Sequence, residues 1–187
     1  MGAIDAFVSH SWSDDADTKV HRLRRWFAAN AAHQAATGEG SVSSETGTRT
    51  GSEEVPVESL VWIDVACLNQ FRIDIDLLCL PFFILASKQF VGLVGPTFPS
   101  RLWCLSEVFL AIQLRGGREE SPCVMIHLGA DSETPDGLSF QEIFGACDAA
   151  RARCHEIEDR DHLLAVIESS FGSIRRFNNI LRSMKLS

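Results

Sequence analysis

The sequence lacks a long apolar run, an excess of basic residues and any paired cysteine motif. No apolar stretch approaches the roughly 20 residues that a membrane-spanning helix needs, and the longest, residues 77–86, suits a buried helix. The formal net charge of −8 argues against nucleic-acid binding, because phosphate backbones attract basic surfaces. The first residues show neither a secretory signal nor a myristoylation pattern. We therefore expect no nucleic-acid partner and no membrane partner.

The cysteines do not suggest a disulfide framework or a metal site. None forms a C-x-x-C pair, and no histidine is spaced with them as a zinc ligand would be. Most lie in apolar stretches, which is typical of free, buried thiols in a reducing compartment. We expect a cytoplasmic protein without a bound metal, whose thiols are all free: Cys67, Cys79, Cys104, Cys123, Cys147 and Cys154.

The length and composition fit one domain that spans residues 1–187. With 187 residues, 45% of them hydrophobic, the chain can bury a core without cross-links. Apolar runs and helical periodicity alternate along it. They predict strands over 4–9, 60–64, 90–95 and 123–128, helices over 18–29, 73–88 (kinked at Pro81), 102–114, 140–151 and 163–184, and a short strand near 152–157 as an alternative in an ambiguous region.

Two features surround the first predicted helix. Its apolar residues, Val20, Leu23, Trp26 and Phe27, recur at helical spacing, with arginine and lysine on the other face. The following residues 36–58 are rich in Gly, Ser, Thr and Glu and hold almost no bulky apolar side chain. Such a segment cannot bury enough surface to offset its ordering entropy, so we expect a disordered insertion.

The alternation of strands and helices predicts an α/β fold with a parallel sheet covered on both faces. In open sheets of this kind, ligands bind beyond the carboxyl ends of the strands. Those ends carry three loops that are polar or contain glycine and proline, at residues 9–14, 64–70 and 96–101. A functional site is expected there.

Glu107 is the most informative single residue. It is the only charged side chain between Arg101 and Arg115, in the apolar segment LWCLSEVFLAIQL. Burying a lone carboxylate costs several kcal/mol, on the order of what any unpaired buried ion costs. Either Glu107 pairs with a basic residue or backbone N–H groups and fixes packing, or it faces a ligand site where a retained charge has a task. Trp103 lies one turn earlier on the same face, and Ser100 precedes the helix.

Three segments resemble Toll/interleukin receptor (TIR) domains. DAFVSHSWSDD is similar to their first strand and loop, SLVWIDVACLNQ to their second strand and loop, and PTFPSRLWCLSEVFLA to their S-x-x-W-C-L-x-E-L segment. The segments occur in the family's order over roughly the first 115 residues. The chain departs from animal receptor members in lacking their C-terminal Phe-Trp signature. The resemblance implies a flavodoxin-like three-layer sandwich with four to five parallel strands in the order 2-1-3-4-5.

The resemblance also implies a chemistry, the cleavage of NAD+ at the nicotinamide–ribose bond. The glutamate of the W-C-L-x-E segment is the essential residue in catalytic members, and Glu107 occupies that position here. NAD+ would be the substrate and no further cofactor is expected. The resemblance further implies substrate contacts from His10, Ser11 and Trp12 of the first loop. Asp64, Ser100 and Trp103 are further candidates for substrate contacts, because of their positions at the strand ends and around the Glu107 helix.

Each of these residues also has a structural interpretation. Ser9, His10 and Ser11 could close a turn or cap the first helix. Asp64 could satisfy loop N–H groups. Trp103 suits the core, and Cys104 suits small buried filling better than a nucleophile.

A second function is compatible with the resemblance. Many TIR domains act only by homotypic assembly through the second-strand loop, here residues 65–75. Catalytic members also require assembly, in signalling or defence, so the two functions are not exclusive. The glutamate favours the hydrolase, since scaffold members commonly lack it. A receiver or flavin-binding domain is a weaker alternative. A receiver domain needs a cluster of acidic residues at the strand ends, and only Asp64 is well placed for that role.

Overall fold

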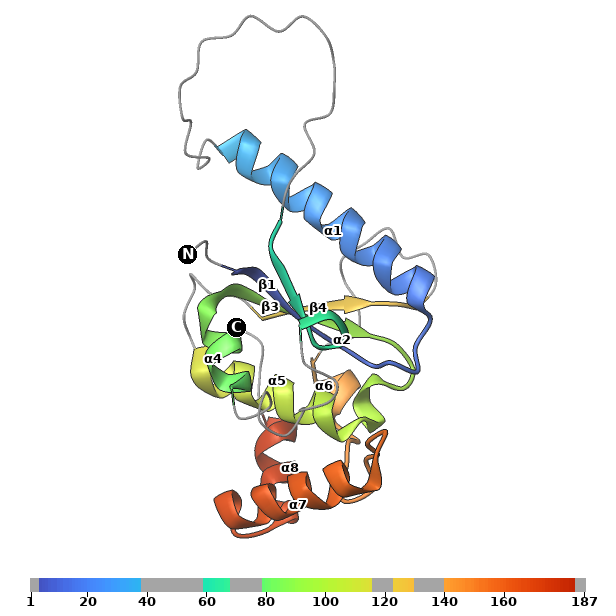
Figure 1. Cartoon of the computed structure of the whole chain (residues 1–187), viewed down its shortest axis with the longest axis vertical. Helices are drawn as coiled ribbons and strands as arrows, with labels where there is room; N and C mark the ends of the chain where they lie inside the picture. The colour runs from blue at the N-terminus through green and yellow to red at the C-terminus, as the bar shows by residue number, and fades with distance from the viewer. Residues whose placement is uncertain (1–3, 38–58, 68–78, 116–122, 130–139, 184–187) are drawn as a thin grey trace, which may run out of the picture.

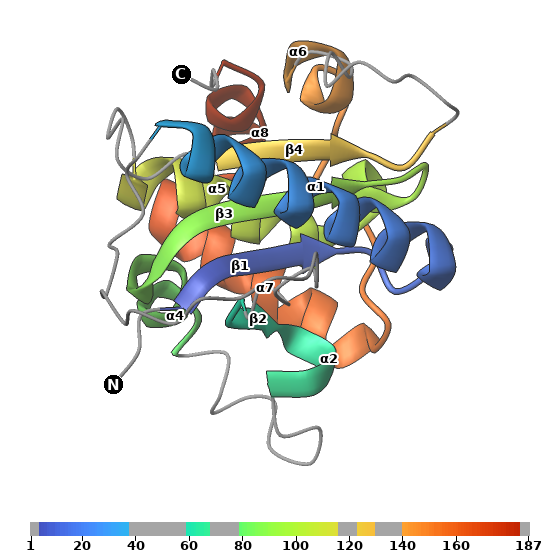
Figure 2. The ribbon, with the colours of Figure 1, turned by 90° about the horizontal axis from the view of Figure 1, so that it is seen from above.

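A four-stranded parallel sheet forms the centre of the computed structural model, which describes residues 4–37, 59–67, 79–115, 123–129 and 140–183. The strand order is β2-β1-β3-β4 (Figures 1 and 2). This confirms the predicted α/β class and the predicted order of the first four strands. The strands are β1 (Ile4–His10), β2 (Val61–Ile63), β3 (Ser87–Val94) and β4 (Cys123–His127).

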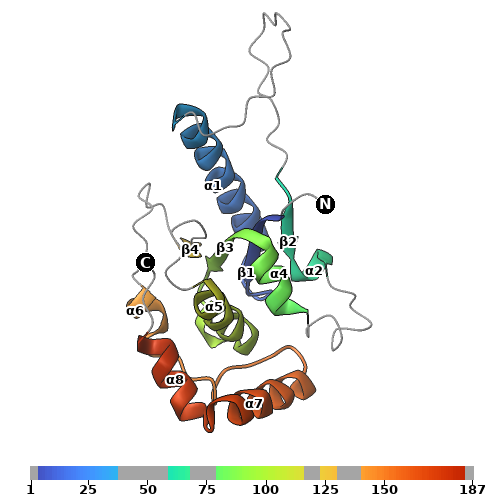
Figure 3. The ribbon, with the colours of Figure 1, turned by 90° about the vertical axis from the view of Figure 1, so that its left-hand side faces the viewer.

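Helices cover both faces of the sheet, and further helices lie outside the inner layer (Figure 3). Helix α1 crosses one face, whereas α4 and α5 pack on the other. Helices α7 and α8 lie beyond α5, on the side away from the sheet. The bounds are α1 (Ala16–Thr37), α2 (Asp64–Cys67), α4 (Leu80–Ala86), the 3-10 turn η1 (Phe98–Ser100), α5 (Leu102–Arg115), α6 (Phe140–Phe144), α7 (Ile157–Phe171) and α8 (Ile174–Ser183).

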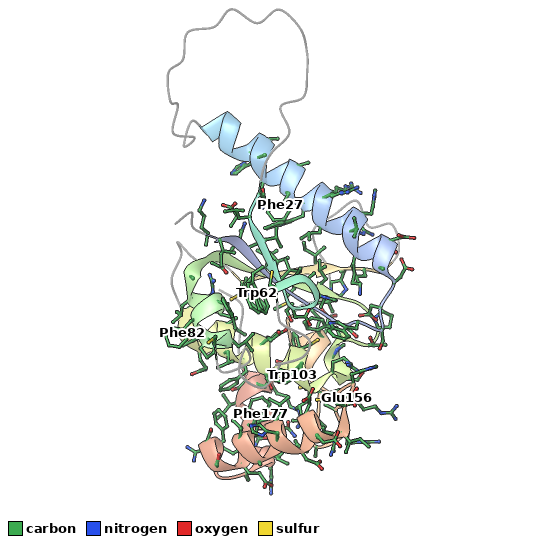
Figure 4. All side chains as sticks on the ribbon, viewed as in Figure 1. Phe27, Trp62, Phe82, Trp103, Glu156 and Phe177 are labelled. Carbon is green, nitrogen blue, oxygen red and sulfur yellow. The ribbon has the colours of Figure 1, made fainter. Side chains whose placement is uncertain are left out.

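Side chains of β1 alternate between two hydrophobic clusters, as a strand covered on both faces requires. Ala6 and Val8 belong to the cluster beneath α1. Phe7 belongs to the larger cluster, where its ring stacks on Trp62 with centroids 4.3 Å apart. Figure 4 shows Trp62 beside the sheet and Phe177 among the lower helices, both of which contribute to that larger cluster.

The first helix was predicted correctly in kind but only partly in orientation. Leu23, Trp26 and Phe27 pack toward the sheet as expected. Val20 is exposed, and Lys19, expected on the polar face, is buried. The helix extends to Thr37, and the rest of the predicted insertion, residues 38–58, lies outside the described residues.

The predicted helix 73–88 includes part of a strand, because its described residues belong to α4 and to the start of β3. Residues 68–78 lie outside the described ranges, and α4 ends at Ala86, where β3 begins. Pro81 lies in the first turn of α4 and does not kink it, because a proline at that position gives up no helical hydrogen bond. An apolar run alone cannot separate a buried helix from a buried strand, which explains the error.

The C-terminal predictions were less accurate. Helix α6 stops at Phe144, well short of the predicted residue 151. The predicted helix 163–184 is two helices, because Gly172 adopts φ 78° and ends α7. Within the described residues no fifth strand forms, and near 152–157 there is only a single parallel bridge between Arg101 and Arg153.

Candidate active site

The candidate site lies at the carboxyl end of the central strand β1. Ser9 and His10 are the last residues of that strand, and the loop that follows leads into α1. Asp64 begins α2 immediately after β2, and Thr97 follows β3. Helix α5 runs against this end of the sheet and contributes Glu107. The fold therefore gathers the three loops that the sequence indicated.

Glu107 is buried and its carboxyl group contacts the end of β1. Only 7% of the residue is exposed, and Ser9 Oγ donates a hydrogen bond of 2.5 Å to its Oε2. Within the described ranges no lysine, arginine or histidine forms an ion pair with it. An ion pair with a basic residue, one form of the structural alternative, is therefore absent among the described residues.

The surroundings of Glu107 favour its protonated form. Burial raises the pKa of Glu107 to about 8, the negative charge of Asp64 acts in the same direction, and the Ser9 hydrogen bond opposes both. At neutral pH about nine in ten of these carboxyl groups then hold a proton. A carboxyl group that ionises near physiological pH is typical of groups that handle charge or protons in a reaction.

Asp64 contacts two other predicted site residues, His10 and Trp12. Its Oδ1 lies 3.0 Å from His10 Nε2, and its Oδ2 accepts a hydrogen bond of 2.7 Å from Trp12 Nε1. Lys19 Nζ lies 3.3 Å from His10 Nδ1 and donates to the Ser11 carbonyl at 2.8 Å. A charged ammonium group only donates, so Nδ1 of His10 accepts and Nε2 carries the proton directed at Asp64.

Lys19 brings a positive charge into this network. Burial lowers the pKa of Lys19, whereas the charges of Asp14 and Asp64 raise it. The network of His10, Trp12, Asp64 and Lys19 thus combines an imidazole, an indole, a carboxylate and an amine.

Ser11 belongs to a second group of polar contacts beside this network. Its hydroxyl lies 2.6 Å from Thr97 Oγ1. Asp14 Oδ1 accepts hydrogen bonds from Thr97 N at 3.1 Å and from Thr97 Oγ1 at 2.7 Å. A Cβ atom on Gly95 would lie 2.4 Å from the Asp14 carboxylate, so glycine is needed for this close approach. The contacts tie the first loop to the end of β3.

Two predicted residues do not join these contacts. Ser100 is exposed, and its hydroxyl donates to the Thr97 carbonyl at 2.7 Å, which caps a local turn. Trp103 packs against the larger hydrophobic cluster (Figure 4). Cys104 is buried with its thiol directed at the His10 carbonyl, 3.4 Å away, and burial raises the pKa of that thiol well above its usual value. Cys104 therefore fills space, as expected.

Residues near in space but distant in the chain were missed. The sequence does not predict the contact of Ser9 with Glu107, and it does not single out Lys19, Asp14 or Thr97 as site residues. Ser9 and Glu107 are 98 positions apart, so no local pattern could connect them. The available signal was position, because Ser9 and Thr97 lie where two parallel strands end.

The six cysteines are all free, Cys67 and Cys79 being exposed. Across the described residues, no group of three or more His, Cys, Asp or Glu side chains is arranged to hold a metal ion. Nor does any described helix have the length and apolar character to cross a membrane.

Comparison of the chain with protein-family models, with curated proteins and with solved structures finds no match in any of the three.

Proposed function

We propose that this protein hydrolyses NAD+ at the bond between nicotinamide and ribose, with Glu107 as the catalytic residue. The observation that supports this most directly is the contact between Glu107 and Ser9. It holds a buried carboxyl group, without a basic partner among the described residues, at the end of the central strand. The TIR-like segments support the same substrate, since Glu107 occupies the position of their essential glutamate.

The proposed reaction needs one carboxylate and no acid for the leaving group. NAD+ and water give ADP-ribose, nicotinamide and a proton. The C–N bond breaks with its electron pair moving to the cationic ring, so nicotinamide departs neutral and unprotonated. Positive charge develops on the ribose, where a nearby carboxylate stabilises it. Attack by the adenine of the same molecule, in place of water, would give a cyclic product.

The pKa of Glu107 fits this task if the substrate itself supplies the counter-charge. In the free protein burial favours the neutral acid. The cationic nicotinamide ring would favour the carboxylate when it binds, because an opposite charge nearby lowers a carboxyl pKa. Glu107 would then release its proton to solvent before the C–N bond breaks. Ser9 would orient the carboxylate through the hydrogen bond it already donates.

The surrounding residues are proposed to bind rather than to react. Trp12 is 42% exposed and offers an aromatic face beside the site. Asp64 offers its carboxylate to ribose hydroxyls and also fixes the orientations of His10 and Trp12. His10 and Ser11, whose side chains are bonded to Asp64, Lys19 and Thr97, would contact the ligand by exchanging one of these bonds for a bond to ribose. Ser100 is exposed and would contact the ligand at the rim. Trp103 would act from the core, by holding α5 and therefore Glu107 in position.

The test measures nicotinamide release from NAD+ by concentrated protein, because we propose that activity depends on self-assembly. Wild type is compared with Glu107→Gln, which keeps the shape of the side chain, and with Glu168→Gln, which alters an exposed glutamate on α7. We expect release by wild type and by Glu168→Gln, and a fall of roughly 100- to 1,000-fold for Glu107→Gln. Equal turnover by all three would show that Glu107 is not catalytic.

A non-catalytic interaction module is the second candidate. Phe82 on α4 is 71% exposed and Leu85 is 47% exposed, and large exposed apolar side chains favour protein–protein contacts. The proposed assembly loop 65–75 lies partly in α2 and mostly among residues outside the described ranges. If wild type stays inert at concentrations where it self-associates, this candidate replaces the hydrolase.

A further inference from the structure

Two arginines face each other at the rim of the candidate site. Arg101, just before α5, and Arg153 form an isolated parallel bridge. Arg153 N donates to the Ser100 carbonyl at 2.8 Å, and Leu102 N donates to the Arg153 carbonyl at 3.0 Å. Side chains of paired residues leave a bridge on the same side, with backbones about 5 Å apart. Like charges so placed repel each other.

Nothing in the described part of the chain neutralises this pair by an ion pair. Acidic side chains do occur in the same segment, where Glu156 lies 3.7 Å from His155 and Asp159 acts on the Cys154 thiol. The chain as a whole is acidic, with a net charge of −8. The pair of adjacent arginines without carboxylate partners therefore makes a locally basic site on an acidic protein.

The backbone that carries Arg153 is held in place. Arg160 donates from Nε to the Ala152 carbonyl at 3.0 Å and from Nη2 to the Ala150 carbonyl at 2.6 Å. Ala152 is buried, whereas Arg153 and His155 are exposed, so the extended segment directs its basic side chains outward. A fixed backbone reduces the ordering cost of binding a ligand there.

Trp12 connects these basic residues to the candidate active site. Its indole N–H donates to Asp64, and its ring centroid lies 6.1 Å from that of His155. Burial raises the pKa of the Cys104 thiol and the charge of Arg101 opposes that rise, which puts Arg101 in electrostatic range of the first turn of α5. The N-terminus of α5, a helix of 14 residues, adds partial positive charge at the same place. Trp12 therefore lies between Asp64 of the candidate site and the segment that carries Arg153.

We propose that Arg101 and Arg153 bind the pyrophosphate group of a dinucleotide while Glu107 acts on its nicotinamide end. This inference rests on the proposed function for the identity of the ligand. Two adjacent guanidinium groups match the paired phosphates of a diphosphate ester, since each can donate two parallel hydrogen bonds to phosphate oxygens. Anion binding also relieves the repulsion within the pair. Trp12 and His155 border the same anion and offer ring faces to the adjoining nucleoside.

The first experiment uses inorganic pyrophosphate as the probe, by calorimetric titration at low ionic strength. It compares wild type, Arg153→Gln, the double variant Arg101→Gln/Arg153→Gln, and the control Arg175→Gln/Arg176→Gln. The control removes two exposed arginines from α8 and so gives the same net charge as the double variant. Arg153 is exposed, so its single substitution tests the proposal even if the double variant fails to fold.

We expect wild type and control to bind alike, Arg153→Gln to bind more weakly, and the double variant to bind at least roughly tenfold more weakly. No binding by wild type, or an equal loss in the control, would overturn the proposal.

A second readout separates this inference from the proposed hydrolysis. In nicotinamide release, the double variant should raise the KM for NAD+ about tenfold and leave kcat within about twofold, since the lost contacts are far from the reacting bond. Turnover with an unchanged KM would overturn the pyrophosphate site and leave the hydrolysis standing. Pyrophosphate binding without turnover by wild type would overturn the hydrolysis and leave the anion site standing.

Discussion

The two halves of helix α5 bury an acidic and a basic group in different ways. Near its C-terminal end, Arg115 directs its guanidinium at the backbone carbonyls of Ile84, Ser87 and Lys88, with the Ser87 contact at 2.8 Å. Those carbonyls lie where α4 ends and β3 begins. In the middle of the helix, Glu107 accepts a hydrogen bond from one serine hydroxyl among the residues that the structure describes. Arg115 is well supplied with partners and Glu107 is not.

The difference separates a structural charge from a functional one. A buried charge that contributes to folding is surrounded by groups that satisfy it, as the carbonyls satisfy Arg115. A buried charge that must act on a ligand is left partly unsatisfied and lowers stability in the absence of that ligand. The comparison predicts that replacing the two residues has opposite effects on the free energy of unfolding.

The largest expected effect is on the stability of Glu107→Gln at high pH. The folded protein holds a proton on Glu107 that the unfolded chain loses above its ordinary pKa of 4.5, and keeps it up to a pH of about 8. Wild-type stability from this group therefore falls as the pH rises between those values, by about 1.4 kcal/mol per pH unit and no more than about 5 kcal/mol in all. Glutamine does not ionise, so Glu107→Gln does not lose this part of its free energy of unfolding as the pH rises.

Urea unfolding of wild type and Glu107→Gln over this pH range tests the prediction. The variant should gain on wild type with each step in pH, whereas the control Glu168→Gln should follow wild type within about 0.5 kcal/mol. A difference between wild type and Glu107→Gln that stays constant with pH would mean that the pKa of Glu107 is not raised.

Arg115→Met should have an effect of comparable size, in the opposite direction. Methionine replaces much of the volume but leaves the carbonyls at the start of β3 without their donor, which costs about 1–3 kcal/mol for each buried group left unpaired. Urea unfolding should show this loss, while nicotinamide release per folded molecule stays unchanged. The exposed Arg25→Met on α1 serves as the control, and a similar loss there would assign the effect to charge alone.

Ser9→Ala should have the smallest effect. The Ser9 hydrogen bond lowers the pKa of Glu107 against the effect of burial, so its removal should raise that pKa further. We expect a change in stability of about 1 kcal/mol and a shift of the Glu107 titration to higher pH. If the titration does not move, or moves to lower pH, the hydroxyl does not support the charged form.

The α/β class and the end of the sheet that carries the polar loops were predictable from the alternation of apolar strands and helices. The order of the first four strands followed from the resemblance to TIR domains. The ends of the helices and strands were less predictable. The run of apolar residues through α4 and into β3 hides the change of structure at Ser87. At the C-terminus, helical periodicity continues across Gly172, whose positive φ ends α7, and Ser173 Oγ then accepts a hydrogen bond from Arg176 N at the start of α8.

The residues of the candidate site also fall into those that the sequence indicates and those that only the structure reveals. Glu107 stood out because its neighbours in the chain are apolar, and His10, Trp12 and Asp64 because they follow strands. Ser9 and Lys19 depend on contacts between distant parts of the chain. Lys19 in particular is buried although the sequence places it on the polar side of α1, because its ammonium group donates a hydrogen bond to the Ser11 carbonyl.

The central claim is that the buried Glu107 carboxyl serves a reaction, and the pH dependence of NAD+ cleavage tests it most directly. Burial raises the pKa of Glu107 to about 8, and the proposed reaction needs the ionised form. We predict that wild-type kcat/KM for nicotinamide release rises about tenfold per pH unit up to that pKa and then levels off, whereas Glu107→Gln stays low at every pH. A variant profile that coincides with that of wild type would contradict the account.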